Sequence, residues 1–170
     1  MRIRTFVASA ILIAAATTGA FADFNRWSSE VEKDPFSGGE KTSVDYSTST
    51  RSGVSMYCDT AESGIEVRIA PGYVYTADMQ QLKPVMEFAI DGTKLQFVPA
   101  PANVISVGDN LAAASLFLNK EQSITLVKAF ADAKSQIAIK DGMSDRPHLL
   151  RASGSTKTGQ AIVRCVEKQK

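Results

Sequence analysis

Alternating apolar and polar residues over 53–69 form the clearest structural pattern in the chain. The apolar positions are Val54, Met56, Cys58, Ile65, Val67 and Ile69. Because successive side chains of a strand point to opposite faces of a sheet, this period of two predicts two strands with one buried face. The intervening residues 61–64 end in Gly64, which can adopt the positive φ that a tight hairpin loop requires. This hairpin directs Cys58 into the core.

Similar patterns predict further strands on both sides of the hairpin. The segments are 24–31, 41–50, 83–90, 94–98, 112–118, 136–140 and 148–152, with a short aromatic segment at 73–75. Asp91-Gly92, between two of these segments, is a strong hairpin signal. Segment 112–118 fits a helix as well as a strand, and we favour the strand because a clearer helix follows it.

Two helices are predicted in the C-terminal half. The first covers 121–133, with an apolar stripe formed by Leu126, Val127, Phe130 and Ala133. The second is capped by Ser155 or Thr156, and its inward face carries Ile162, Cys165 and Val166. The fold class is therefore α+β and mainly β, with an antiparallel, sandwich-like sheet core and two helices in the C-terminal half.

The N-terminal residues have the pattern of a secretory signal peptide. Arg2 and Arg4 precede an apolar run over 6–16 that is too short to span a bilayer, and Ala20-Phe21-Ala22 provides small residues before a cleavage site. We expect residues 1–22 to be removed after Ala22, leaving one exported domain over 23–170 that is periplasmic or secreted. No later apolar stretch is long enough for a membrane-spanning helix.

Cys58 and Cys165 are the two cysteines of the chain. In an exported protein the favoured state is a disulfide between them, which would tie the C-terminus to the central hairpin. The alternative is two free thiols, one of them reactive. Only Arg164, beside Cys165, offers a basic neighbour that could activate a thiol.

The charge balance excludes some classes of partner. The chain has 19 Lys and Arg against 18 Asp and Glu, and loss of Arg2 and Arg4 would leave 17 basic residues. A nearly neutral protein gives no electrostatic argument for binding nucleic acid or an anionic membrane. The aromatic residues are scattered and predict no base-stacking platform.

No catalytic, cofactor or metal site is predicted. His148 is the single histidine, and we interpret it as a surface residue because no spacing supplies a nucleophile and an orienting carboxylate. Segment 153–159 is rich in glycine but lacks the lysine position of a phosphate loop, so we interpret it as a strand-to-helix turn. We interpret the acidic cluster Asp59, Glu62 and Glu66 as a solvated hairpin end. The polar group Asp141, Asp145 and Arg146 is likewise interpreted as a solvated loop.

The order of the motifs resembles known exported proteins. The motifs are the Trp27 strand, the strand ending in Cys58, Ile-x-Val-x-Ile over 65–69, Ser-Gln-Ile-Ala-Ile over 135–139, Gly154 and the helix with Cys165. This order resembles proteins related to the invasion-associated locus B family, and is similar to the VasI/TagO-like periplasmic accessory proteins of type VI secretion. The chain departs from the latter in having one cysteine pair and Phe88-Ala89-Ile90-Asp91 in place of Arg-x-Asp. The resemblance implies a non-enzymatic, disulfide-bonded β-sandwich-like domain and carries over no catalytic residue.

Three hypotheses for function follow. The first is a non-enzymatic accessory protein that contacts an envelope or secretion-system protein through Tyr73, Val74 and Tyr75. The second is a module that binds a small ligand or glycan in a pocket lined by Trp27 and tyrosines. The third is a hydrolase, which would require Asp59 or Glu66 to converge with Asp91.

Overall fold

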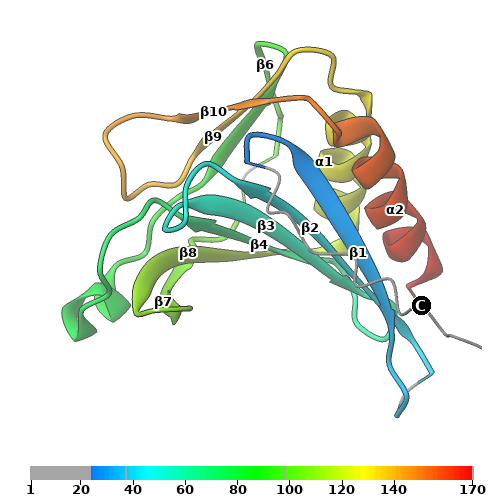
Figure 1. Cartoon of the computed structure of the whole chain (residues 1–170), viewed down its shortest axis with the longest axis horizontal. Coiled ribbons are helices and arrows are strands. Elements are labelled where there is room, and N and C mark those ends of the chain that lie inside the picture. The colour runs from blue at the N-terminus through cyan, green and yellow to red at the C-terminus, as the bar shows by residue number, and fades with distance from the viewer. Residues whose placement is uncertain (1–23, 37, 98, 170) are drawn as a thin grey trace, which may run out of the picture.

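The computed structural model describes residues 24–36, 38–97 and 99–169. The predicted signal peptide, residues 1–22, lies outside the described residues. The described part of the chain forms two antiparallel sheets, two α-helices and one short 3-10 helix, η1 (Ala77–Gln81) (Figure 1). The predicted fold class, mainly β with two helices late in the chain, is confirmed.

Sheet A contains most of the predicted strands. Its strands, in spatial order, are β1 (Trp27–Lys33), β2 (Glu40–Ser47), β3 (Gly53–Asp59), β4 (Ile65–Ala70), β8 (Leu111–Leu118) and β7 (Asn103–Val107). The registers align Val44, Met56, Val67 and Leu116 in one buried row across four strands. The predicted hairpin is β3–β4, and Gly64 at its turn has a φ of 94°.

Sheet B is smaller and covers one end of sheet A. Its spatial order is β10 (His148–Arg151), β9 (Gln136–Lys140), β5 (Glu87–Ile90) and β6 (Thr93–Lys94). The Asp91-Gly92 hairpin is present as β5–β6, although β6 is shorter than predicted. The inner face of sheet B contributes Phe88, Ile90, Ile137, Ile139 and Leu150 to the core that it shares with sheet A.

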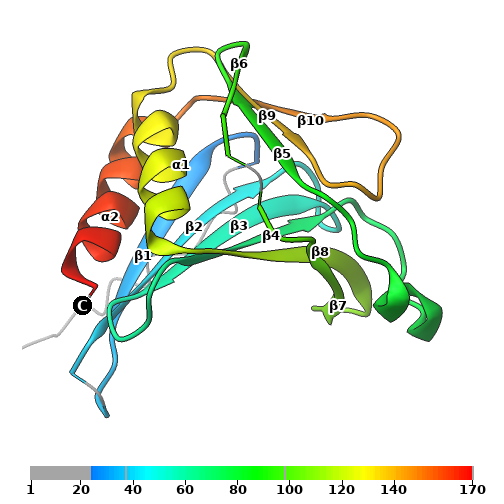
Figure 2. The ribbon, with the colours of Figure 1, turned by 180° about the vertical axis from the view of Figure 1, so that it is seen from behind.

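The helices α1 (Lys120–Asp132) and α2 (Ser155–Lys168) pack against each other and cover the other end of the inner face of sheet A. Figure 2 shows α1 in front and sheet B beside the helix pair, both on the same side of sheet A. The apolar stripe predicted for 121–133 is buried, with Leu126, Val127 and Phe130 inside. The helices and sheet B therefore enclose the core against a single face of sheet A.

Trp27 joins several elements in the core. Its side chain is 2% exposed, and its ring lies 4.9 Å from that of Tyr46 and 4.7 Å from that of Phe130, centroid to centroid. Its Nε1 donates a hydrogen bond to the carbonyl of Arg151 at 3.0 Å. Trp27 thus connects β1, β2, α1 and β10, and presents no surface to a partner.

The C-terminus is tied to the β3–β4 hairpin, as the cysteine positions predicted. Cys58 and Cys165 form a disulfide across 107 residues. The buried side chain of Gln169 adds a second connection, because its Nε2 donates to the carbonyls of Gly64 and Asp59 and its Oε1 accepts from the amide of Gly64. The free-thiol alternative is excluded.

Three local predictions were wrong or incomplete. Strand β1 begins at Trp27 rather than at Phe24, since Asn25 has a φ of 60° that a strand does not allow. Strand β7 was not predicted, although the turn residues 108–110 that follow it are a hairpin signal. Neither Ser155 nor Thr156 caps α2: the cap position is Gly154, with a φ of 89°, where a Cβ would lie 2.4 Å from the carbonyl oxygen of Trp27.

No helix in the described ranges is both long and apolar enough to cross a membrane.

Candidate functional site

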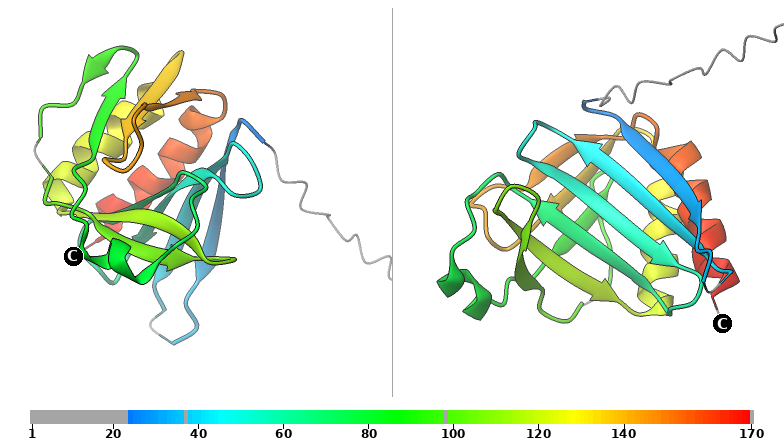
Figure 3. Two further views of the ribbon diagram at one scale, coloured as in Figure 1. Left: turned by 90° about the vertical axis from the view of Figure 1, so that its left-hand side faces the viewer. Right: turned by 60° about the horizontal axis from the view of Figure 1, so that its bottom comes forward.

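No helix or strand in the described ranges covers the outer face of sheet A. Figure 3, right, shows this face toward the viewer, with both helices and sheet B behind it. Alternation along the strands places Tyr57, Glu66, Arg68, Ser115 and Phe117 on this face, because their neighbours Met56, Val67 and Leu116 are buried on the other. A sheet face without a covering layer is the first place to look for a binding site.

A groove of about 350 Å³ crosses this face near the β3–β4 turn. Five strands and the turn contribute to it. Its lining residues are Glu30, Glu32, Lys41, Thr42, Ser43, Tyr57, Cys58, Asp59, Glu62, Gly64, Glu66 and Phe117. We call this the outer groove.

A fixed polar network borders the outer groove, which it reaches through Tyr57 and Glu66. The guanidinium of Arg68 donates two hydrogen bonds to the Glu66 carboxylate, from Nε to Oε1 and from Nη2 to Oε2, each 2.7 Å long. The Ser115 hydroxyl donates to Oε1 of the same carboxylate at 2.5 Å, and the Arg68 guanidinium lies 4.7 Å from the centroid of the Tyr57 ring. Four side chains from three adjacent strands thereby hold one another in place.

The electrostatics of this network favour its charged form. Burial by itself would raise the pKa of Glu66, but the hydrogen bonds from Arg68 and Ser115 and the charge of Arg68 lower that pKa below its usual value. The hydrogen bonds to Glu66 raise the pKa of Arg68, partly opposed by burial. Glu66 is therefore a carboxylate near neutral pH, and it is a poor proton donor.

Two exposed aromatic side chains stand beside the network. Phe117 is 55% exposed and Tyr57 is 36% exposed, and both lie within regular strands. Tyr57 also lines a second groove, of about 360 Å³, that continues over the same face past Ser55 and Leu111. Exposed aromatic residues on an open sheet face are typical of binding surfaces.

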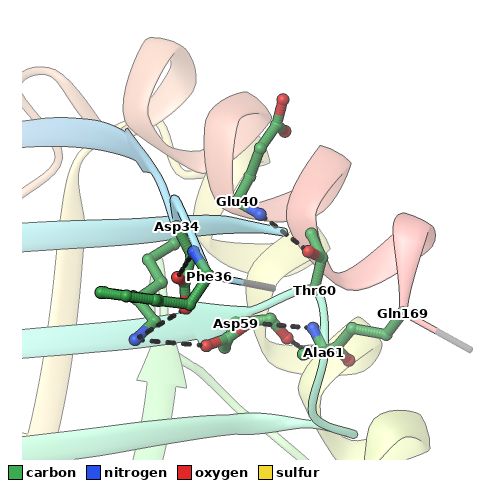
Figure 4. A network of polar contacts seen from close by, with 8 residues as sticks. Asp34, Phe36, Glu40, Asp59, Thr60, Ala61 and Gln169 are labelled. Atoms are coloured by element: carbon green, nitrogen blue, oxygen red, sulfur yellow. Dashed lines mark hydrogen bonds and ion pairs between the residues drawn. The ribbon is translucent and has the colours of Figure 1, made fainter. Parts of the chain in front are cut away.

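The rim of the outer groove is acidic, and ion pairs fix it near the turn of the β1–β2 hairpin. Nζ of Lys41 lies 3.6 Å from Oδ2 of Asp34 and 3.7 Å from Oδ2 of Asp59. The other oxygen of Asp59 accepts the Ala61 amide, which fixes the β3–β4 turn (Figure 4). Figure 4 also shows Gln169 of the C-terminus reaching the same turn from the side of the helices. The disulfide and the Gln169 contacts thus support one wall of the groove.

The structure separates the residues predicted to interact with a partner. Trp27 is buried, so no ligand pocket forms around it. Tyr73 and Val74 are 45% and 53% exposed, and Tyr75 is half-buried. These three residues follow β4, where Val74 bridges to Leu111, and they are not among those that line the outer groove.

Asp91 does not join Asp59 and Glu66 in the outer groove. Its carboxylate accepts hydrogen bonds from the amides of Gln136, Lys134 and Ser135 and from the Ser135 hydroxyl. These contacts hold the pKa of Asp91 well below its usual value and attach the β5–β6 turn to the start of β9. The outer groove therefore does not bring Asp91 together with Asp59 or Glu66, the pairing on which the hydrolase hypothesis was based.

A second polar cluster, missed by the sequence analysis, lies in the β9–β10 connection. Asp141, predicted to be solvated, is fully buried. Its carboxylate contacts His148 Nε2 at 2.8 Å and accepts from the hydroxyl of Ser144 and the amides of Met143 and Ser144. His148 is accordingly part of a local network and not a free surface residue. The sequence feature that could have indicated this cluster is the Asp141-Gly142 turn between two short strands, with the single histidine at the start of the second strand.

Ser144 and His148 do not have the order of a catalytic triad. A hydroxyl has one proton, and Ser144 donates it to Asp141 instead of to the histidine.

Within the described ranges, no three His, Cys, Asp or Glu side chains are placed to hold a metal ion.

Comparison of the chain with models of known protein families, with curated proteins and with solved structures finds no match. The resemblance to exported accessory proteins therefore stays a prediction from the sequence.

Proposed function

We propose that this protein is a non-enzymatic interaction protein of the bacterial cell envelope, in which the outer face of sheet A binds another envelope protein. A periplasmic or secreted location is supported by the disulfide, which persists in oxidising compartments, and by the predicted signal peptide. A secretion- or invasion-associated role is the specific form of this proposal that the sequence resemblance suggests.

The observation that carries the proposal is the uncovered outer face of sheet A. Every other described element that builds the core lies on its inner side, while Tyr57 and Phe117 are exposed on the outer side. Exposed aromatic side chains are unfavourable in contact with water, and interfaces are enriched in them. An interaction surface accounts for their position.

The state of the polar residues supports a binding role over catalysis. Glu66 is engaged by Arg68 and Ser115, Asp91 by three backbone amides, and Asp141 is buried among donors. Their lowered pKa values leave them as carboxylates that accept hydrogen bonds, whereas an acid catalyst near neutral pH requires a raised pKa.

The alternative is a module that binds a small ligand or glycan at the same groove. Its support is the combination of an aromatic ring with carboxylates and a hydroxyl in a groove of about 350 Å³, a size typical of small-ligand sites. The groove is open and lies on a sheet face, which favours a macromolecule over a small ligand enclosed on most sides.

The test is affinity capture of the oxidised mature protein from its own cell envelope, with three matched variants. Phe117→Ser removes an aromatic side chain from the outer groove, and Leu149→Ser removes a similarly exposed apolar side chain, 61% exposed, from sheet B. Val74→Ser tests the patch predicted from the sequence.

We expect a discrete protein partner that is retained by the wild type and by Leu149→Ser but not by Phe117→Ser. Loss of the partner with Val74→Ser alone would move the interface to the 73–75 segment and contradict the outer-face proposal. Co-purification of a glycan or small molecule, with no protein partner, would favour the alternative.

A further inference from the structure

The outer groove has a strong charge of one sign. Its lining includes five carboxylates, Glu30, Glu32, Asp59, Glu62 and Glu66, and a single lysine, Lys41. Lys41 lies between Asp34 and Asp59, and Glu66 is paired with Arg68, so the acidic character of the groove rests mainly on Glu30, Glu32 and Glu62. Glu30, Glu32 and Glu62 are exposed. The lining of the outer groove is therefore rich in acidic residues, although the chain as a whole has 19 Lys and Arg against 18 Asp and Glu.

The groove also has the dimensions of an extended peptide. Its lining runs from Glu30 and Glu32 on β1 to Phe117 on β8, across β2, β3 and β4. Strands in a sheet are about 4.8 Å apart, so five neighbouring strands span roughly 19 Å, the length of about six residues in extended conformation. A compact ion would fill only a small part of such a groove.

The two ends of the groove differ in chemistry. At the β1 end the exposed side chains are the carboxylates of Glu30 and Glu32, and at the β8 end the exposed side chain is the ring of Phe117. The ring can contact an apolar side chain, the aliphatic stem of a lysine or a cation over its face. The Arg68 guanidinium already lies over the Tyr57 ring, so Phe117 is the more accessible aromatic side chain for such a contact.

We propose that the outer groove binds an extended, cationic segment of the partner protein, with Lys or Arg side chains at Glu30, Glu32 and Glu62 and an apolar or aliphatic contact at Phe117. This inference rests on the proposed function, since it names the chemistry of the partner at the same face. Charge complementarity raises the rate of association and rejects partners of the wrong sign, and anionic segments are repelled from this groove.

The test uses a defined probe and the oxidised mature protein. The probe is a capped ten-residue peptide of alternating lysine and valine, and its counterpart has glutamate in place of lysine. The groove variant is Glu30→Gln/Glu32→Gln, which keeps side-chain size and removes two charges. The matched control is Asp78→Asn/Asp109→Asn, which removes two exposed charges from η1 and from the β7–β8 turn, outside the groove lining.

Isothermal titration at low salt should show binding of the lysine peptide to the wild type and to the control, and no binding of the glutamate peptide. The groove variant should bind the lysine peptide about tenfold more weakly, since exposed ion pairs are individually weak but add when several face one ligand. Raising the salt from about 50 to 300 mM should weaken binding to the wild type more than to the groove variant, because screening acts on the charges that the variant lacks.

Either of two titration results would overturn the inference. One is failure of the lysine peptide to bind the wild type at low salt, and the other is equal weakening by the groove and control variants. Loss of partner capture with Phe117→Ser but not with Glu30→Gln/Glu32→Gln would keep the outer-face function and reject the cationic segment. Retention of the partner by both would reject the proposed function itself.

Discussion

Asp141 shows how a buried charge is held in this fold. Burial by itself would raise its pKa, but the hydrogen bonds from His148, from the amides of Ser144 and Met143 and from the Ser144 hydroxyl lower the pKa to about 2. Because a carboxylate can only accept hydrogen bonds, the Nε2 atom of His148 must carry a proton in this arrangement. Four hydrogen bonds from the β9–β10 connection and β10 thus converge on the Asp141 carboxylate and hold the connection in place.

We predict that Asp141→Asn lowers the free energy of unfolding at pH 7 by about 1 to 3 kcal/mol, because the NH2 group that replaces one carboxylate oxygen cannot accept the hydrogen bonds made to that oxygen. The sign of the pH dependence follows from the lowered pKa. The stabilisation is fully present above the unfolded-state pKa near 3.8 and is lost as the pH falls toward 2. The difference in stability between wild type and Asp141→Asn should therefore shrink between pH 4 and pH 2.

Urea unfolding followed by circular dichroism at several pH values measures this difference. Asp145→Asn, an exposed change in the same loop, is the control and should unfold like the wild type. Asp91 and Glu66 also have lowered pKa values, so it is the difference between the two proteins, and not the acid sensitivity of either, that reports on Asp141. A constant difference across the acidic range would contradict the assignment.

Sequence patterns predict which side chains are apolar and buried, but not which polar side chains are buried with them. The alternation around Cys58 was sufficient to orient that side chain, and the disulfide was predicted from the presence of two cysteines in an exported chain. The Asp141-Gly142 turn indicates a tight loop but not that Asp141 is buried while Asp145 is exposed, because burial of a carboxylate depends on donors that the loop brings to it.

At the scale of elements, the helix pair depends on one glycine. A Cβ at Gly159 of α2 would lie 2.6 Å from both Cα and Cβ of Ala131 in α1, closer than carbon atoms approach without strain. The absence of a side chain allows the two helices to pack at this distance. Besides α1, helix α2 also contacts β1, β2 and β3.

We predict that Gly159→Ala destabilises the protein by about 1 to 3 kcal/mol, as insertion of a methyl group into a packed interior does. Alanine would ordinarily stabilise a helix relative to glycine by about 1 kcal/mol, so the sign of the effect separates packing from helix propensity. Gln160→Ala, at the next and exposed position of α2, is the control and should have little effect. A stabilised Gly159→Ala protein would contradict the close packing of the helices.

The elements found from sequence are those with a complete local signal. The β3–β4 and β5–β6 hairpins have alternation and a turn glycine, and α1 has its apolar stripe. Strand β7 lies between prolines and a turn and has only five residues, so its pairing with β8 decides its structure more than its own pattern does. The cap of α2 was misassigned because the requirement for Gly154 arises from Trp27, which is 127 positions away in the sequence and adjacent in space.

At the scale of the whole molecule, the candidate site is a consequence of how the layers stack. Apolar and polar residues alternate along strands of both sheets, so the sequence indicates that each sheet has one apolar face. It does not indicate that sheet B and both helices share the same side of sheet A, which is what leaves Tyr57 and Phe117 exposed and the outer groove open. The sequence suggested Trp27 and the 73–75 segment as interaction residues; Trp27 is buried, while the 73–75 segment stays a prediction.

The disulfide contributes to the stability of the whole fold because it joins β3 of sheet A to α2, the last helix. Removal of a cross-link that closes a loop of about 100 residues costs up to about 4 to 5 kcal/mol in the chain-entropy description. We predict that Cys58→Ala/Cys165→Ala unfolds about 10 °C below the oxidised wild type, given the temperature shift per kcal/mol of a domain this size. Alanine is chosen because it adds no buried hydroxyl group at either position.

Thermal unfolding of both proteins with and without reductant measures the effect. Reductant should lower the melting temperature of the wild type toward that of the double variant and leave the variant unchanged. The Gln169 contacts to Gly64 and Asp59 remain in the variant, so it should still fold below its melting temperature, with the outer groove intact. Equal melting temperatures of wild type and variant would mean that Gln169 and the core alone hold α2 against the β3–β4 hairpin.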